Sequence, residues 1–230
     1  MKFVSLFIAV FISHFGSISA QQLQQPLEEV PFSNKGYVLL KTGNIVDGTI
    51  HSTSGGRGIN QVKLEDSNGI KHSLNASEIQ EFAVAMNGAT RLQYTMESGS
   101  SVKKLFSRDQ PTAKPDEFII YRNTSVNGEE ELLLQLLNPH FDSIFEVFYD
   151  PYARKTTALE GELVTWTGEK HRAYFISKNG SPLLKVKEGN YKQAFPTLFG
   201  DCAQLAGIEK PKLRDIENHI LHYQNCCAFN

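Results

Sequence analysis

The chain has 230 residues, with a hydrophobic content of 40% and a charged content of 21%, which is typical of a protein with a buried core and not of a disordered chain. Its formal net charge is −2, and its basic residues form no stripe or long run, so nucleic acid is not expected as a partner.

The first twenty residues have the organisation of a secretory signal peptide. Lys2 supplies a positive charge, Phe3 to Ile12 form an apolar run, and Ile18-Ser19-Ala20 precedes Gln21 as a cleavage sequence. The apolar run is shorter than the roughly 20 residues that span a membrane. We therefore expect removal of residues 1–20, no transmembrane segment in the mature chain, and export to the periplasm, the cell surface or the medium.

The mature chain divides by pattern into three parts. Residues 21–35 are rich in Gln and contain two prolines, which predicts a flexible lead-in. Residues 36–188 contain short β-type runs separated by turn residues, which predicts a β-rich domain. This domain can be divided into a small barrel at 36–85 and a larger antiparallel sheet at 90–188. Residues 189–230 have helical periodicity.

About ten strands are expected in the β-rich region. The apolar runs that predict them are residues 37–40, 45–50, 61–65, 70–74, 91–96, 102–106, 117–126, 129–137, 144–149, 162–166, 171–177 and 183–187. Asn127-Gly128 is the strongest hairpin signal and predicts a tight turn of type I′. Asn75 and Glu78 have the spacing of a capping box, so a short helical turn is expected there.

The C-terminal part predicts three short helices. Tyr191 to Phe199 form the first, with Pro196 inside it, and Asp201 to Gly207 form the second. Pro211 opens the third. Its apolar residues share one stripe at 100° per residue, namely Leu213, Ile216, Ile220, Tyr223 and Cys227. The expected fold is mainly β, with an antiparallel small barrel or sandwich-like sheets followed by a short C-terminal α-helical segment.

Three cysteines, in a chain expected to be exported, predict one disulfide. Cys227 lies in the apolar stripe of the last helix and faces inward, whereas Cys226 lies on the flank with His219. We therefore predict a bond between Cys202 and Cys227. Fraying of the last helical turn would turn Cys226 towards Cys202 instead, so a bond between Cys202 and Cys226 is the alternative.

No motif in the sequence carries a recognisable chemistry. The chain has no G-x-S-x-G elbow, no P-loop, no G-x-G-x-x-G after a strand and no H-E-x-x-H. His219, His222, Cys226 and Cys202 could form a zinc set, but a polar helix flank beside a disulfide is the favoured interpretation. No catalytic residue, metal or cofactor is therefore predicted.

Two further groups of residues, one acidic and one aromatic, are candidates for a binding or catalytic site. Asp142, Glu146 and Asp150 recur at a four-residue spacing, for which a solvated strand face is the favoured interpretation. Most aromatic residues of the β region are expected in the core. Tyr149-Asp150-Pro151-Tyr152 and Trp166 are the exceptions, because they lie next to turns and so are expected to be exposed.

Several segments resemble a group of uncharacterised exported proteins of Bacteroidota-type bacteria. The segments that carry the resemblance are residues 36–44, 48–50, 62–64, 77–79, 145–149, 174–176 and 191–202. The resemblance implies export and a β-rich architecture, and it also favours a cysteine four residues after Tyr223; it implies no activity. A second resemblance covers residues 38–74, whose Leu40, Gly43, Gly48 and Ile50 are spaced as in small five-stranded barrels of the Sm or SH3 type.

These expectations lead to a function class. The export signal, the β architecture and the missing catalytic motifs favour a non-enzymatic binding, adaptor or structural module, with an envelope protein, a glycan or a peptide as its partner. The alternative is an envelope hydrolase with a site assembled from dispersed residues.

Overall fold

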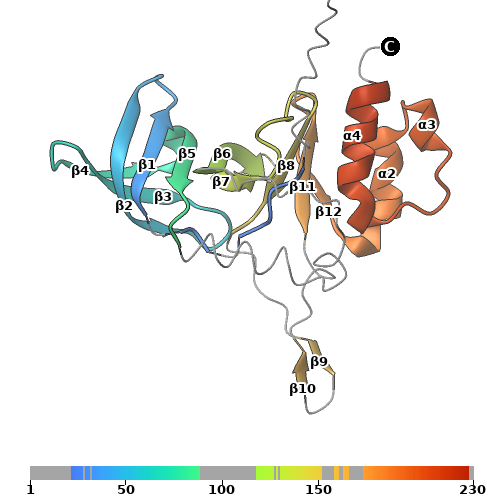
Figure 1. Ribbon diagram of the computed structural model, residues 1–230, viewed down its shortest axis with the longest axis horizontal. Helices are drawn as coiled ribbons and strands as arrows, with labels where there is room; N and C mark the ends of the chain where they lie inside the picture. The colour runs from blue at the N-terminus through green and yellow to red at the C-terminus, as the bar shows by residue number, and fades with distance from the viewer. Residues whose placement is uncertain are drawn as a thin grey trace, which may run out of the picture.

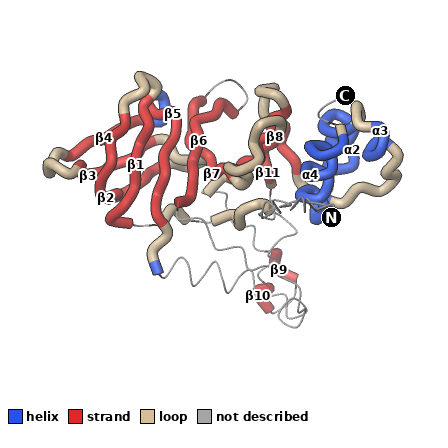
Figure 2. Tube along the Cα trace, turned by 45° about the horizontal axis from the view of Figure 1, so that its top comes forward, coloured by secondary structure: helices blue, strands red, loops and turns tan. Residues whose placement is uncertain are grey.

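The computed structural model describes residues 22–27, 29–31, 33–88, 118–126, 128, 130–151, 158–160, 163–165 and 173–227. A ten-stranded antiparallel sheet runs through most of this part of the chain, and three α-helices lie together at one end of it (Figures 1 and 2). The strand order is β12-β11-β8-β7-β6-β5-β1-β2-β3-β4. The fold is therefore mainly β with a C-terminal helical segment, as the sequence predicted.

The strands of the main sheet are β1 (Ser33–Leu40), β2 (Ile45–Ser54), β3 (Gln61–Asp66), β4 (Lys71–Asn75), β5 (Ile79–Ala85), β6 (Phe118–Val126), β7 (Glu130–Leu136), β8 (Phe145–Tyr149), β11 (Tyr174–Lys178) and β12 (Leu184–Val186). β9 (Ala158–Glu160) and β10 (Leu163–Thr165) form a separate two-stranded sheet. The predicted strands 91–96 and 102–106 lie outside the described residues.

The first five strands have the order β5-β1-β2-β3-β4, and the 3-10 turn η1 (Ala76–Glu78) connects β4 to β5. The expected capping box is present at this turn, because the Glu78 carboxylate accepts the Asn75 N–H at 2.8 Å. β2 pairs with β1 through its first half and with β3 from Gly48 onward, and its pairing with β3 shifts register between Ile50 and Ser52. The sheet does not close into a barrel here, since β5 pairs on its outer side with β6.

The hairpin of β6 and β7 differs in detail from the expected turn. Val126 pairs with Glu130, so three residues and not two separate the paired ends. Gly128 has the positive φ that was predicted, 75°. Asn127 lies outside the described residues. The loop between the paired ends is therefore three residues long, and the expected two-residue type I′ turn is wrong.

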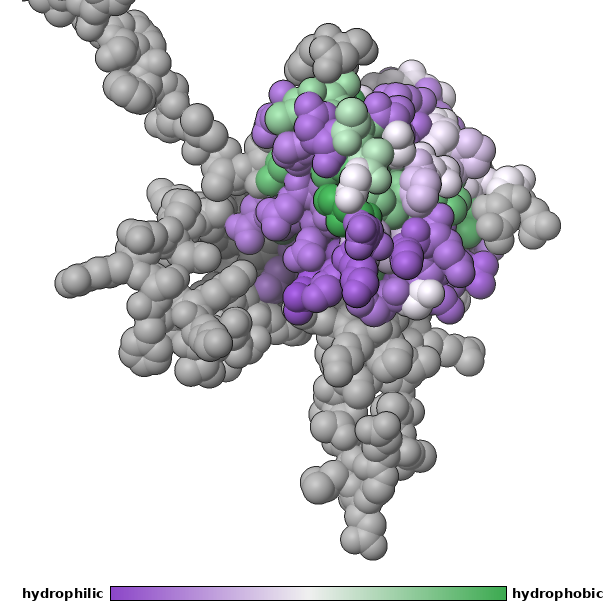
Figure 3. Space-filling model, turned by 90° about the vertical axis from the view of Figure 1, so that its right-hand side faces the viewer, coloured by the Kyte–Doolittle hydropathy of each residue, from purple (hydrophilic) through white to green (hydrophobic). Residues whose placement is uncertain are grey.

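The helical segment consists of α2 (Tyr191–Phe199), α3 (Ala203–Ala206) and α4 (Ile216–Cys226), with single 3-10 turns, η3 (Glu188–Asn190) and η4 (Leu213–Asp215), before α2 and α4. The predicted stripe of α4 is confirmed. Leu213, Ile216, Ile220 and Tyr223 are all buried in one apolar cluster with residues of α2 and the strands β8 and β11. The outer surface at the helical end is mostly hydrophilic, with a limited apolar area (Figure 3).

The segment before β1 is packed, which corrects the flexible lead-in expected at residues 21–35. Leu27 and Val30 are 4% and 9% exposed and join the core of the first five strands, while Leu23 packs against the helical core. β1 already begins at Ser33. We call residues 22–31 the N-terminal strap. Its apolar side chains are few, but they reach two different cores and so connect the two ends of the sheet.

Candidate functional site

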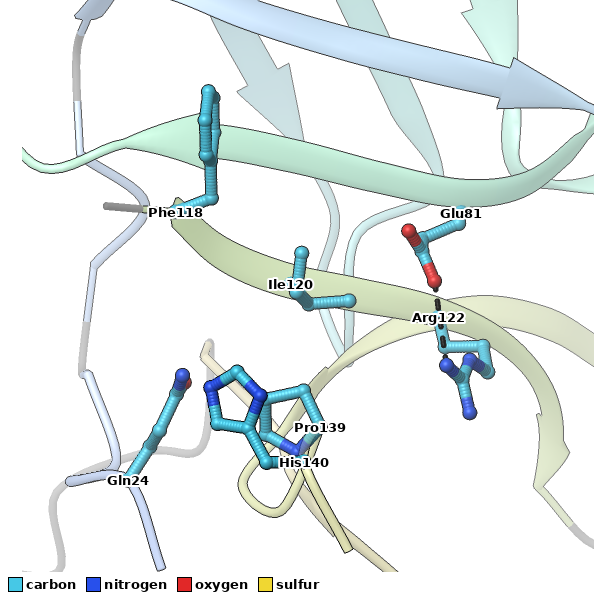
Figure 4. Close-up of a pocket in the computed structure, with 7 residues that line it drawn as sticks. All are labelled: Gln24, Glu81, Phe118, Ile120, Arg122, Pro139 and His140. Carbon is cyan, nitrogen blue, oxygen red and sulfur yellow. Dashed lines mark hydrogen bonds and ion pairs between the residues drawn. The ribbon is translucent and has the colours of Figure 1, made fainter. Parts of the chain in front are cut away.

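A pocket of about 330 Å³ opens on one face of β6 (Figure 4). Phe118, Ile120 and Arg122 alternate along this strand and therefore point to the same face. The other lining residues come from β5, the strap and the loop after β7; they are Glu81, Gln24, Pro139 and His140. Four segments of the chain thus build one site, which we call the Arg122 pocket.

Arg122 binds three carboxylates. Its Nη1 lies 2.7 Å from Asp142 Oδ2 and 2.8 Å from Glu146 Oε1, and its Nη2 lies 3.3 Å from Glu81 Oε2. The guanidinium fork suits this geometry, because it presents several N–H donors in one plane. The second oxygen of Glu81 accepts the Tyr37 hydroxyl at 2.9 Å.

The electrostatics of this cluster keep its groups in fixed ionisation states. Burial alone would lower the pKa of Arg122, but the hydrogen bonds to Glu146 and Asp142 outweigh burial and raise it. Burial, followed by the hydrogen bond to Glu81, raises the pKa of Tyr37 to about 12. Arg122 therefore stays a cation and Tyr37 stays neutral at any physiological pH. Three carboxylates facing one guanidinium give the cluster an excess of two negative charges.

The apolar side of the pocket is built around Phe118. The centre of its ring lies 5.9 Å from that of Tyr37 and 5.2 Å from Lys35 Nζ, and both of these residues are on β1. Together with Ile120 and Pro139, this ring gives the pocket a wall without hydrogen-bonding groups. A fixed polar cluster beside an apolar wall is the usual composition of a small ligand pocket.

The strap is held in the pocket wall by Gln135, a residue that sequence reasoning missed. Gln135 is fully buried in β7, where its amide oxygen accepts the Leu27 N–H at 2.7 Å and its amide nitrogen donates to Gln25 O at 2.9 Å. The Gln24 N–H donates to Leu137 O at 2.6 Å. Gln24 therefore reaches the pocket because the backbone on both sides of it is fixed. The one signal in the sequence is a polar residue inside the run Leu132 to Leu137.

The acidic residues that were interpreted as a solvated face are engaged in contacts within the protein. Asp142 and Glu146 both bind Arg122, and Asp150 is 7% exposed, with Oδ1 accepting the Gly58 N–H at 2.8 Å. Asp142 and Glu146 are partly exposed and Asp150 is buried, so the three do not form one solvated face. The interpretation was wrong because it considered only the spacing within one segment. The partners come from β6 and from the loop after β2.

The residues expected to be exposed near turns are buried where the structure describes them. Tyr149 is 4% exposed, and Asp150 and Pro151 are also buried. Tyr152 and Trp166 lie outside the described residues. An aromatic binding row at Tyr149 is therefore excluded, and the aromatic ring that lines the pocket is the half-buried Phe118.

The predicted disulfide is present. Cys202 and Cys227 are bonded, with their Cα atoms 5.5 Å apart, and Cys226 is an exposed free thiol. Cys202 is buried, as expected for a residue on the surface that packs against the apolar stripe of α4. Since both sulfur atoms of the bond are used, Cys202 is not available as the fourth ligand of the zinc set that was considered.

His219 does not lie on a polar flank, contrary to expectation. It is 7% exposed, its Nδ1 lies 2.7 Å from the Tyr191 hydroxyl, and its ring packs against Phe195 and Phe199. Burial lowers its pKa. Among the described residues, no group of three or more His, Cys, Asp or Glu side chains is arranged to hold a metal ion.

A comparison with known proteins finds no family model, no curated protein and no solved structure that matches the chain. In the described part of the chain, no helix has both the length and the apolar character needed to cross a membrane.

Proposed function

We propose that the chain is an exported binding module and that the Arg122 pocket is its ligand site. The observation that carries the proposal is the state of the pocket's polar groups. Arg122 engages Glu81, Asp142 and Glu146 at once, and Tyr37 occupies the remaining oxygen of Glu81. A general base must be free to take a proton from its substrate, whereas each oxygen of Glu81 already accepts a hydrogen bond, one from Tyr37 and one from Arg122. The arrangement therefore favours binding over hydrolysis.

The size and lining of the pocket support a particular ligand size. A volume of about 330 Å³ is at the lower end of ligand pockets, so it suits one sugar ring or one amino-acid side chain of a larger partner. The apolar face of such a group would contact Phe118 and Ile120. Its polar groups would face Gln24, His140 and the carboxylates around Arg122.

The proposed location rests on other observations. The Cys202–Cys227 disulfide is typical of proteins that fold under oxidising conditions. The sequence of residues 1–20 has the pattern of a signal peptide, and the chain resembles exported proteins of Bacteroidota-type bacteria. We place its partner, an envelope protein, glycan or peptide, in the periplasm or at the cell surface.

The test compares two matched truncations of an apolar side chain. Phe118→Ala removes the pocket wall, whereas Ile45→Ala removes a side chain that is 64% exposed and lies in β2. The mature protein and both variants are immobilised and used to capture partners from native envelope extract and from a glycan array. We expect the wild type and Ile45→Ala to retain the same ligand and Phe118→Ala to bind at least tenfold more weakly. Equal binding by all three would exclude the pocket, and chemical conversion of the ligand would favour the hydrolase.

A further inference from the structure

The contact between α2 and α4 is built around one buried histidine. The ring centre of His219, on α4, lies 5.0 Å from that of Phe195, 5.8 Å from that of Phe199 and 5.9 Å from that of Tyr191, all on α2. Only 7% of the residue is exposed. Three aromatic rings around an imidazole exclude the water that a charged ring would need.

The hydrogen bond in this cage suits the neutral ring. Tyr191 Oη lies 2.7 Å from His219 Nδ1, so the hydroxyl can donate to the unprotonated nitrogen. Burial, followed by the charge on Asp215, raises the pKa of Tyr191, and the hydroxyl therefore keeps its proton. A protonated His219 would have an N–H at Nδ1, and the same contact would then require the hydroxyl to act only as an acceptor.

The charged and titratable groups that face His219 do not compensate a proton. Burial is the main effect and lowers the pKa of His219; Asp215, at the start of α4, acts in the opposite direction, and His222 adds to the lowering. The buried Nε2 of His222 has no hydrogen-bond partner among the described residues.

We propose that this contact is an acid-sensitive latch, in which protonation of the caged His219 frees α4 from α2 while the Cys202–Cys227 disulfide keeps α4 tethered. The bond joins the start of α3 to the end of α4, across a sequence separation of 25. Opening would expose Tyr191, Phe195 and Phe199 as one aromatic surface on α2, and the tether would let the latch close again at neutral pH.

The direction of the effect follows from linkage. A group whose folded pKa is lowered binds a proton more readily in the open form, so opening is favoured as the pH falls below the ordinary value of 6.5. The open fraction should rise by up to tenfold for each pH unit below that value, until the folded form also takes up the proton.

The test is hydrogen exchange of the mature protein between pH 7.5 and pH 5, corrected for the intrinsic rate at each pH. We expect protection to fall selectively in α4, with β1 and β5 as internal references. His219→Gln keeps an acceptor for Tyr191 but does not titrate, so it should abolish the pH dependence. His51→Gln changes an exposed histidine of β2 and should leave the pH dependence of exchange in α4 intact.

Two results would overturn the proposal. One is loss of protection in the strands at the same pH as in α4, and the other is an unchanged profile in His219→Gln. If His219→Gln does not fold, a nuclear magnetic resonance titration of His219 in the wild type tests the latch instead. A ring of His219 that titrates at 6.5 or above, with α4 still protected, contradicts the latch.

Discussion

The carboxylate of Asp150 accepts a hydrogen bond from the backbone N–H of Gly58, 92 residues earlier in the chain, at 2.8 Å. The next residue, Ile59, pairs with Leu133 by two backbone hydrogen bonds of 3.0 and 2.9 Å. The glycine-containing loop after β2 is therefore attached to β7 and to the end of β8. This contact connects the first five strands to the rest of the sheet by a route other than the β5–β6 pairing.

Gly58 cannot be replaced without cost at this contact. Its φ is +61°, and an added Cβ would lie 2.9 Å from Leu132 Cβ. We expect Gly58→Ala to lower the free energy of unfolding by about 2 kcal/mol, from backbone strain and overpacking together. Gly56→Ala is the control in the same loop, because nothing lies within 4 Å of the added atom. Urea unfolding measures both, and equal stability of the two variants would contradict the attached loop.

Gln135→Leu tests the attachment of the strap. The substitution leaves the Leu27 N–H and the Gln25 carbonyl without their side-chain partner, so we expect a loss of about 2–3 kcal/mol. Proteolysis within residues 22–31 should also become faster. Gln80→Leu makes the same change at an exposed position of β5 and should have little effect. If Gln135→Leu leaves the free energy of unfolding unchanged, the strap is held by its apolar side chains alone.

Loss of the disulfide should destabilise the helical end. Chain entropy for a closed loop of 25 residues gives about 3 kcal/mol, and we expect this loss in the double variant Cys202→Ala, Cys227→Ala. Cys226→Ala removes the exposed thiol and should unfold at the wild-type midpoint. Thermal unfolding without reductant makes the comparison. Peptide mapping that finds Cys202 bonded to Cys226 would contradict the pairing.

Arg122→Met should destabilise the protein. Without the guanidinium, Glu81, Asp142 and Glu146 lose their cationic partner, and we expect the variant to lose about 2 kcal/mol at pH 7. Arg57→Met, at an exposed position, is the control. Denaturant unfolding measures both variants, and a loss no larger than that of Arg57→Met would contradict a stabilising role for Arg122.

The mature N-terminus is expected at Gln21. The mass of the exported protein should therefore equal that of residues 21–230 with one disulfide. Cleavage at this point leaves Leu23 in place, whose N–H lies 3.3 Å from Glu217 Oε2 on α4. Retention of residues 1–20 would contradict export by signal cleavage, and a start beyond Leu23 would contradict the contact of the strap with α4.

Local patterns allowed the sequence to predict the strands, the helices and the disulfide. The stripe of α4 depends on residues within three turns of one another, and it located Cys227 correctly. Arg122 could not be found in this way, because its carboxylates come from 20 to 41 residues away. The role of Gln135 could not be predicted either, since it binds backbone groups, which every residue has and which therefore leave no pattern in the sequence. His219 looked like a surface residue because periodicity does not show that α2 packs against the side of α4 on which His219 lies.

The strap also sets an order of events for a chain that crosses a membrane from its N-terminus. Residues 22–31 emerge first, yet Gln135 lies 108 residues after Leu27, and Glu217 lies 194 residues after Leu23. The first five strands can pair while these partners are still on the other side, but Leu27 and Val30 cannot be fixed from both sides until β7 has followed. In the export that we propose, the segment translocated first is therefore among the last to be secured, and vectorial folding would end where translocation began.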